Sequence, residues 1–258
     1  MISEKRRNRL LDLVRTRGFA SLNDLADELD VSESTIRRDL DHLEELGTAK
    51  RTHGGVFYTG PKPNLPHFRE AQKWEWDRKR QIAQCASTLI NEGDTVLLDG
   101  GSTTYELAQH LVGRTVQVVT NSLPVANLFT ASNNSDLIFV GGYVHLRTGV
   151  SLGPYANEML GTLNAQKAFL SVAGISERGF FNSNLLLVET ERAMIQAADQ
   201  TLVVADSTKF GRQSLAHLCK LGEVSAVVVD HGIDQAWISR LESSGVKLFI
   251  ADPTSSAE

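Results

Sequence analysis

The strongest chemical signal in the sequence is a loop that suits a phosphate group. The apolar strand expected at residues 94–98 ends at Asp99 and leads into a helix through Gly100, Gly101, Ser102, Thr103 and Thr104. Glycines let a backbone approach a ligand closely, and a helix N-terminus offers unpaired N–H groups and partial positive charge. The loop therefore predicts a phosphate cradle, with Asp99 as an acceptor for sugar hydroxyls. An ordinary strand-to-helix turn is the alternative.

Three later junctions resemble this one in chemistry. Polar or small residues follow further expected strands, namely Asn121, Gly141, Gly142 and Lys209. In open α/β sheets, ligands bind beyond the carboxyl ends of the strands, where such residues gather. We therefore place all four in the same effector-binding site, with Lys209 as the cation for an anionic ligand. A helix cap is the alternative for Asn121, and a solvated loop lysine is the alternative for Lys209.

A second group of residues near the N-terminus suits DNA. Hydroxyl and guanidinium groups gather at the start of an expected helix, and two basic residues and a histidine follow in an expected hairpin. Arginine pairs bidentately with guanine or phosphate, while Ser and Thr reach base edges or phosphate oxygens. These residues form the predicted DNA-binding set: Ser32, Ser34, Thr35, Arg37, Arg38, Lys50, Arg51 and His53.

The elements that carry this set read as a helix-turn-helix followed by a β-hairpin wing. Residues 3–17 predict a first helix, Ser21 and Asp24 open a second, and Ser32 caps a third. Apolar residues recur at helical spacing in the third helix, at Ile36, Leu40, Leu43 and Leu46. Two short capped helices with a tight turn between them are typical of DNA-binding modules. A small helical bundle with a solvated charged face is the alternative, because acidic residues such as Asp39 interrupt the basic ones.

Chain length, composition and a cluster of prolines indicate two domains. The chain has 258 residues, of which 41% are hydrophobic and 22% charged, as in soluble globular proteins. Three of the six prolines fall within residues 59–72, which we interpret as a linker between a domain at 3–58 and a domain at 73–252. The net charge of −5 argues against a uniformly basic nucleic-acid binder but permits a small DNA-reading module.

The second domain is predicted to be α/β with a mostly parallel sheet, because strand-length apolar runs alternate with helical stretches. No apolar run approaches the roughly 18 residues of a membrane span, so we expect no membrane partner. Residues 1–9 are charged and lack the apolar stretch of a signal peptide, and Cys85 and Cys219 form no disulfide framework. We therefore expect a cytoplasmic protein.

The motifs resemble those of DeoR-family bacterial transcriptional regulators. The run VSESTIRRDL at 31–40 and HGG at 53–55 are similar to the family's DNA-binding signature. Further similar segments are KRQIA at 79–83, DGGSTT at 99–104, SLG at 151–153 and DSTKFG at 206–211. The resemblance implies a sensor domain whose fold is similar to ribose-5-phosphate isomerase and which senses a phosphorylated sugar or related metabolite. Gln166 stands where the family commonly has Asp, and we leave it out of the site.

An enzyme is the alternative function, since the resemblance extends to isomerases and deaminases of sugar phosphates. Proton transfer on a sugar phosphate needs a base with a tuned pKa, and Asp99, Glu189 and Asp206 are the available carboxylates. Glu189 falls at an expected helix start, where a carboxylate is stabilising in any case. The seven histidines show no metal-ligand spacing, and no nucleophile elbow is present. We expect no catalytic residues, no metal and no cofactor.

The sequence therefore predicts a transcription factor that represses a sugar-catabolic operon. Its expected partners are double-stranded operator DNA and a small phosphorylated sugar, whose binding relieves repression. A module of this size buries little surface on DNA alone, so we expect a homo-oligomer on repeated half-sites. Trp74, Trp76 and Trp237 could pack an oligomer interface, although packing within the chain is the simpler role.

Overall fold

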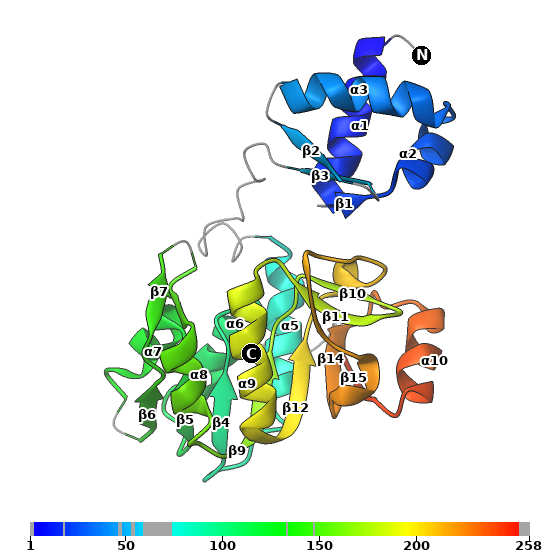
Figure 1. Ribbon diagram of the computed structural model, residues 1–258. Coiled ribbons are helices and arrows are strands. Elements are labelled where there is room, and N and C mark those ends of the chain that lie inside the picture. Colours follow the sequence, from blue (N-terminus) through cyan, green and yellow to red (C-terminus); the bar gives the residue numbers. More distant parts are fainter. Residues whose placement is uncertain are drawn as a thin grey trace. The chain divides into compact units, whose positions relative to one another are not determined.

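The computed structural model shows a chain of two compact units, residues 1–65 and 66–258 (Figure 1). It describes residues 3–17, 19–45, 48–52, 55–58, 74–132, 134–146 and 148–252. The linker predicted at 59–72 falls outside the described residues. In the part of the chain that is described, no helix combines the length and the apolar character needed to cross a membrane.

The first unit is a winged helix-turn-helix. Its three helices are α1 (Ser3–Arg17), α2 (Leu22–Leu29) and α3 (Glu33–Glu45). A three-stranded antiparallel sheet has the order β1-β3-β2, from Phe19–Ala20, Gly55–Tyr58 and Ala49–Thr52. The hairpin of β2 and β3 is the predicted wing, and the helix bounds agree with the helical periodicity of the sequence.

Local signals explain the tight turn between α2 and α3. Ser21 caps α2 by accepting a hydrogen bond from the backbone N–H of Asp24 at 3.1 Å. Asp30 ends that helix in the left-handed conformation, with φ 51°, and α3 begins three residues later. The apolar faces of the helices then meet in one core around Leu10, Leu25 and Ile36, all fully buried.

The second unit is built on a seven-stranded sheet of order β15-β14-β12-β9-β4-β5-β6, and every neighbouring pair is parallel. The predicted parallel sheet is confirmed. Its strands, in chain order, are β4 (Thr95–Leu98), β5 (Gln117–Thr120), β6 (Asp136–Phe139), β9 (Ala165–Leu170), β12 (Ala198–Val204), β14 (Ala226–Asp230) and β15 (Lys247–Ala251).

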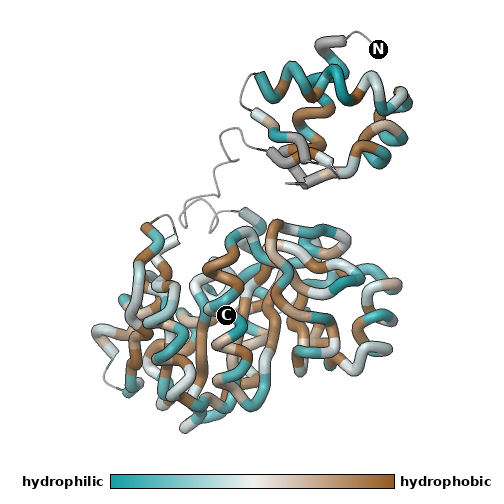
Figure 2. Tube along the Cα trace, in the orientation of Figure 1, coloured by the Kyte–Doolittle hydropathy of each residue, from teal (hydrophilic) through white to brown (hydrophobic). Residues whose placement is uncertain are grey.

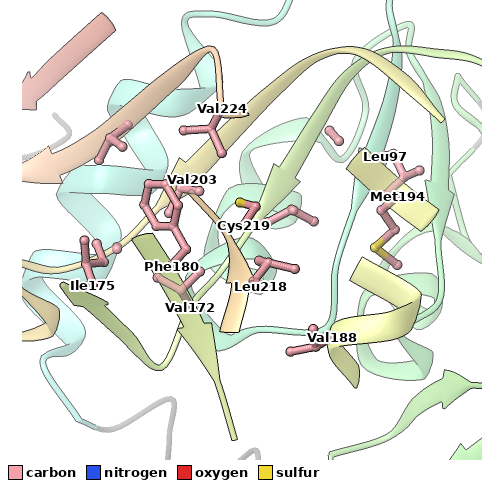
Figure 3. Packing of buried hydrophobic residues seen from close by; sticks show 14 of the residues in the cluster. Leu97, Val172, Ile175, Phe180, Val188, Met194, Val203, Leu218, Cys219 and Val224 are labelled. Atoms are coloured by element: carbon pink, nitrogen blue, oxygen red, sulfur yellow. The ribbon is translucent and has the colours of Figure 1, made fainter. Parts of the chain in front are cut away.

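Helices cover both faces of this sheet, so its strands are apolar on both sides, as the brown strands of Figure 2 show. Residues of α5 (Trp76–Ser87), α6 (Ser102–Leu111) and α7 (Leu123–Phe129) pack in one core. Residues of α8 (Pro154–Leu160), α9 (Leu185–Gln196) and α10 (Gln235–Ser243) pack in the other (Figure 3). Successive strand residues alternate between the cores: Leu97 faces the second, and Val96 and Leu98 face the first.

Smaller elements complete the unit. β7 (Tyr143–His145) and β8 (Val150–Leu152) form a hairpin after β6. β10 (Gly174–Ser176), β11 (Gly179–Asn182) and β13 (Ala216–Cys219) form an antiparallel sheet that adds to the α8–α10 side of the core. Two short 3₁₀ helices, η1 (Ser207–Lys209) and η2 (Leu221–Glu223), follow β12 and β13.

Candidate functional site

The N-terminus of α3 carries a cluster of hydroxyl groups. Ser32 Oγ lies 2.9 Å from Ser34 Oγ and 3.0 Å from Thr35 Oγ1, and it accepts from the Thr35 backbone N–H at 3.4 Å. Ser32 therefore caps the helix as predicted. Ser32 and Ser34 are exposed, at the helix end that carries unpaired N–H groups and partial positive charge. This end can bind a phosphate or enter a DNA groove.

The predicted cations of the first unit lie at its surface where the structure describes them. Arg37 and Arg38 are both exposed on α3, and Arg37 pairs with Glu33 one turn earlier at 3.0 Å. Lys50 is exposed on β2, and the backbone of Arg51 lies on the same strand. His53 falls outside the described residues. Since exposed ion pairs contribute little, the Glu33 contact leaves Arg37 available for DNA.

One acidic residue of α3 has a role that the sequence did not reveal. Asp39 is buried, and its carboxylate accepts from Arg6 Nε at 2.5 Å and from Arg7 Nε at 3.2 Å, both on α1. The idea that Asp39 belongs to a solvated face is therefore wrong. Asp39 fixes α3 against α1, which sets the position of the exposed arginines. Its spacing of three from Ile36 and four from Leu43 was the available signal.

In the second unit, the strand order brings the predicted effector residues to one edge. Successive strands β4, β5 and β6 extend to one side, and β9, β12, β14 and β15 extend to the other, so the order reverses between β4 and β9. Ligands of open α/β sheets bind at such a switch point, beyond the carboxyl ends of the strands. Asp99 follows β4, Asn121 follows β5, Gly141 lies just past β6, and Lys209 follows β12.

Asp99 lies at the switch point, but its oxygens are already occupied. Oδ1 accepts from Gly101 N–H at 3.0 Å and from Thr104 Oγ1 at 2.6 Å, and Oδ2 accepts from Ser171 N–H at 2.7 Å and Oγ at 2.9 Å. Burial raises the pKa of this carboxyl, and the hydrogen bonds offset that only in part. Asp99 therefore joins the loop after β4 to the end of β9, and its role as an acceptor for sugar hydroxyls stays a prediction.

The two glycines of the loop lie against side chains of the protein itself. A Cβ on Gly100 would lie 1.8 Å from Val150 Cγ1, and a Cβ on Gly101 would lie 1.7 Å from Ser171 Oγ. Both positions are filled by the protein's own side chains, so glycine is needed for packing within the chain. The close approach of this backbone to a ligand stays a prediction.

The remaining loop residues divide between scaffold and surface. Thr104 is fully buried and donates to Asp99, and Thr103 is buried as well. Ser102 and Gly101 are partly exposed at the N-terminus of α6, and Gly142 is exposed after β6. The loop thus offers its helix N-terminus and Ser102 to a ligand, while the hydroxyl of Thr104 is bonded within the loop. Effector contacts of Thr103 and Thr104 stay a prediction.

Asn121 is not the helix cap that we considered. Ser122 caps α7, accepting from Val125 N–H at 3.3 Å. Asn121 is fully buried and donates through Nδ2 to the backbone oxygen of Ser151 on β8 at 2.9 Å. Its Oδ1 has no hydrogen-bond partner among the described residues. Because a buried acceptor without a partner is costly, this oxygen suits a donor from a ligand or water.

Lys79 is not among the predicted site residues, although it lies in the KRQIA motif. It is buried on α5, and Nζ donates to the backbone oxygen of Trp74 at 2.5 Å. Burial is the largest influence on the pKa of Lys79 and lowers it. The charges of Asp206 and of Glu106 on α6 raise this pKa, and the charge of Lys209 lowers it. These interactions place η1 and the first turns of α6 around Lys79. A lysine within an otherwise apolar helix face was the available signal.

Glu191 was also missed, because the sequence drew attention to Glu189. Glu189 is exposed, whereas Glu191 is fully buried on α9. Its Oε1 accepts from Asn182 Nδ2 at 2.7 Å, and its Oε2 has no hydrogen-bond partner among the described residues. Burial, and then the nearby Asp99 charge, raise the pKa of Glu191 well above its usual value. Its position three residues from Val188 and from Met194 indicated an inward face.

Other candidate chemistry finds little support. No group of three or more His, Cys, Asp or Glu side chains could hold a metal ion within the residues that are described. Gln166 accepts from Thr95 N–H at 2.5 Å near the starts of β9 and β4, at the sheet edge opposite the site. Trp76 lies under Arg80 at 4.6 Å, and Trp237 packs edge-on against Phe210 at 5.4 Å.

Fold and site together define a class of protein. A winged helix-turn-helix with exposed arginines on its third helix, followed by a doubly wound α/β unit with a ligand-binding edge, is the organisation of a DNA-binding transcription regulator that senses a small molecule. Two family models match the chain: the DeoR-like helix-turn-helix domain at residues 6–61 and the DeoR C-terminal sensor domain at residues 74–231. The chain belongs to the DeoR family of transcriptional regulators.

Similar proteins span nearly the whole chain. The HTH-type transcriptional regulator YulB of Bacillus subtilis is 32% identical over 96% of each chain. YgbI of Escherichia coli K12 is 31% identical over 97% of this chain and 99% of its own. UlaR of Shigella dysenteriae is 27% identical over 96% of this chain and 99% of its own. Because these full-length relatives are named as regulators, the enzyme alternative is not favoured.

Among solved structures, the chain is similar to ribose 5-phosphate isomerase A from Methanocaldococcus jannaschii. The identity is 18%, the match covers 53% of this chain and 55% of the isomerase, and the TM-score is 0.38.

Proposed function

We propose that this regulator is a repressor of a sugar-catabolic operon and that a phosphorylated sugar releases it from DNA. In this proposal residues 3–58 bind the operator, residues 59–72 link the units, and residues 73–252 bind the effector. The observation that carries the proposal is the arrangement of cations and a helix N-terminus at the switch point of the sensor sheet. Lys209, Lys79 and the start of α6 all belong to this edge.

The first unit supplies the DNA contacts. The exposed N-terminal end of α3 enters the major groove, where Arg37 and Arg38 read bases or bind phosphates and Ser34 and Thr35 assist them. Lys50 and Arg51, with His53 after them, hold the phosphate backbone from the wing. One such module makes few base contacts, so we propose a homo-oligomer that reads repeated half-sites.

The sensor unit supplies two kinds of recognition. The phosphate of the effector lies between the N-terminus of α6, with Ser102, and the ammonium of Lys209, while the charge of Lys79 adds to the positive field. Three buried side-chain oxygens have no hydrogen-bond partner among the described residues, namely Gln81 Oε1, Asn121 Oδ1 and Glu191 Oε2. The sugar hydroxyls satisfy the last two of these. A hydroxyl both donates and accepts, so it suits Glu191 whether or not that carboxyl is protonated.

A DNA-binding titration tests the proposal. The full chain is titrated against the intergenic region upstream of its own gene, at fixed salt, with and without a panel of sugar phosphates. Specific binding that one compound weakens supports the function and identifies the effector. Specific binding that no compound alters contradicts the effector part of the proposal. Absence of specific binding, together with turnover of a sugar phosphate, would favour an enzyme.

Two variants separate the two sites. Arg37→Ala should weaken operator binding by about 1–3 kcal/mol and relax specificity at one base pair if Arg37 contacts a guanine. Equal loss on random DNA would instead indicate a phosphate contact. Lys209→Ala should abolish release by the effector while operator binding persists. Lys220→Ala is the matched control, because Lys220 is an exposed lysine of the same unit.

A further inference from the structure

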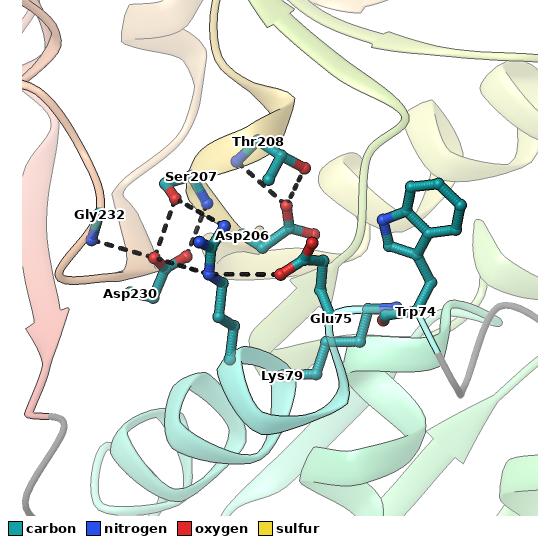
Figure 4. A network of polar contacts seen from close by, with 9 residues as sticks. Trp74, Glu75, Lys79, Asp206, Ser207, Thr208, Asp230 and Gly232 are labelled. Carbon is teal, nitrogen blue, oxygen red and sulfur yellow. Dashed lines mark hydrogen bonds and ion pairs between the residues drawn. The ribbon is translucent and has the colours of Figure 1, made fainter.

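The start of α5 is tied to the loop that carries Lys209. We call Trp74 and Glu75, which immediately precede α5, the junction turn. They are the first described residues of the second unit, which begins at Pro66. Figure 4 shows a polar network that links this turn to η1 and to the end of β14. The network is unexplained by the binding chemistry proposed above.

Asp230 anchors one side of the network. Its buried carboxylate ends β14 and accepts from Ser207 N–H at 2.6 Å, from Ser207 Oγ at 2.9 Å and from Gly232 N–H at 3.0 Å. The first residue of η1 is therefore held by Asp230 through both its backbone and its side chain. Lys209 lies two residues further along the same short helix, so a displacement of Lys209 is communicated to Ser207.

Arg78 bridges from η1 to the junction turn. Its Nη1 donates to Ser207 Oγ at 3.4 Å, and its Nε lies 3.7 Å from Asp230 Oδ2 and 3.3 Å from Glu75 Oε2. One guanidinium thus contacts η1, the end of β14 and the junction turn at once. Two of these contacts are long, so a small shift of Ser207 is enough to redistribute Arg78 among its three partners.

The junction turn is itself held in an unfavourable conformation. Glu75 has φ 52° and ψ 38°, the left-handed region that non-glycine residues rarely adopt, and it makes no side-chain cap to α5. The Arg78 contact holds its side chain, and Lys79 holds the backbone oxygen of Trp74 at 2.5 Å. Such a conformation persists only while its surroundings enforce it, so loss of a contact lets the turn relax.

We infer that Arg78 and Asp230 are positioning residues that couple an anion at Lys209 to the conformation of the junction turn. This inference rests on the proposed function, since it needs an anion at the strand-end site. An anion that draws Lys209 moves Ser207, changes the contacts of Arg78 and alters the support of Glu75. The anion favours whichever arrangement of η1 it binds more tightly, and the junction turn follows that arrangement. Occupancy of the sensor site thereby reaches the segment that leads to the DNA-binding unit.

The tryptophans allow each end of this path to be observed separately. Trp237 packs against Phe210, which follows η1, and Trp74 lies in the junction turn, where it is 67% exposed. The full chain is prepared with Trp74 as its only tryptophan (Trp76→Phe, Trp237→Phe) and with Trp237 as its only tryptophan (Trp74→Phe, Trp76→Phe). Each form is titrated with inorganic phosphate, and calorimetry measures binding independently of fluorescence.

The expected result is that phosphate changes the emission of both reporters with one midpoint. In Arg78→Ala, the phosphate midpoint and the Trp237 response should stay within about twofold, while the Trp74 response falls to less than half. Glu75→Gln should act in the same way and guards against a folding defect in the first variant. Glu92→Gln should leave the Trp74 response intact, because Glu92 pairs with Arg114 just before the starts of β4 and β5, at the opposite edge of the sheet.

Two outcomes would overturn the inference while leaving the proposed function standing. In one, phosphate binds and Trp237 responds, but Trp74 does not. In the other, Trp74 responds fully in both Arg78→Ala and Glu75→Gln. Absence of binding heat and of any Trp237 response would contradict the proposed anion site itself, and the inference would fall with it.

Discussion

Gly101→Ala distinguishes a glycine that serves the fold from a glycine that serves a ligand. The added Cβ would lie 1.7 Å from Ser171 Oγ, where ordinary contact needs about 3.5 Å. Ser171 cannot move away freely, because its N–H and Oγ donate to the buried Asp99 carboxylate at 2.7 and 2.9 Å. Overpacking and the loss of a charged hydrogen bond together should cost about 3–5 kcal/mol of unfolding free energy.

Urea denaturation followed by tryptophan fluorescence measures this loss of stability in the sensor unit, which contains Gly101. All three tryptophans lie in residues 66–258, so the signal reports the sensor unit alone. With a urea dependence of about 3 kcal/mol/M, the unfolding midpoint should fall by about 1–1.7 M. Gly141→Ala is the matched control: its Cβ would meet nothing within 4 Å, and the midpoint should change by less than the equivalent of about 0.5 kcal/mol.

A stable Gly101→Ala protein that has lost its response to effector would refute this reasoning. It would show that the space beside Gly101 belongs to the ligand, as the sequence alone suggested. Adding Ser171→Gly to Gly101→Ala should restore part of the lost stability, because it removes both atoms with which the new Cβ collides. Failure of this pair to recover any stability would also contradict the steric explanation.

Three further predictions concern buried polar groups. Asp39→Ala should lower the free energy of unfolding of the first unit by about 1–3 kcal/mol in a thermal melt followed by circular dichroism; it leaves Arg6 and Arg7 unpaired, but both still reach water. The pKa of the Glu191 carboxyl is higher in the folded protein than in the unfolded chain. Its contribution to the free energy of unfolding is therefore fully present below the unfolded-state pKa, and it is lost as pH rises through the folded-state pKa. As pH rises from 5 to 8, the sensor unit of Glu191→Gln should therefore lose less stability in urea melts than that of the unsubstituted protein. The same dependence of stability on pH in both proteins would contradict a raised pKa for Glu191. Burial raises the pKa of Cys219 to about 12, so at pH 8 its thiol should react with iodoacetamide only after unfolding, as mass spectrometry of the labelled peptide would show.

Much of the fold follows from local pattern. Helical spacing of apolar residues and the capping serines gave α1, α2 and α3 with their order, and the glycine pair after Arg51 indicated the wing. Alternating strand-length and helix-length runs predicted a parallel sheet, since parallel strands require covered faces and therefore apolar sequences. The motifs at 31–40, 79–83 and 206–211 then indicated the family, which the matches at 6–61 and 74–231 confirm.

The tertiary structure decided what each polar residue does. The sequence placed Asp99, Gly100, Gly101 and Thr104 in one loop but could not show that Val150 and Ser171 fill the space beside it. The sequence also could not show that Glu191 contacts Asn182, or that Arg78 contacts Ser207 and Asp230, because separation along the chain does not reveal contact. Hydrogen bonding and burial depend on which segments meet at the switch point, and that depends on the strand order. The sequence therefore determined the class of protein and the region of the site, whereas packing between distant segments assigned the roles within it.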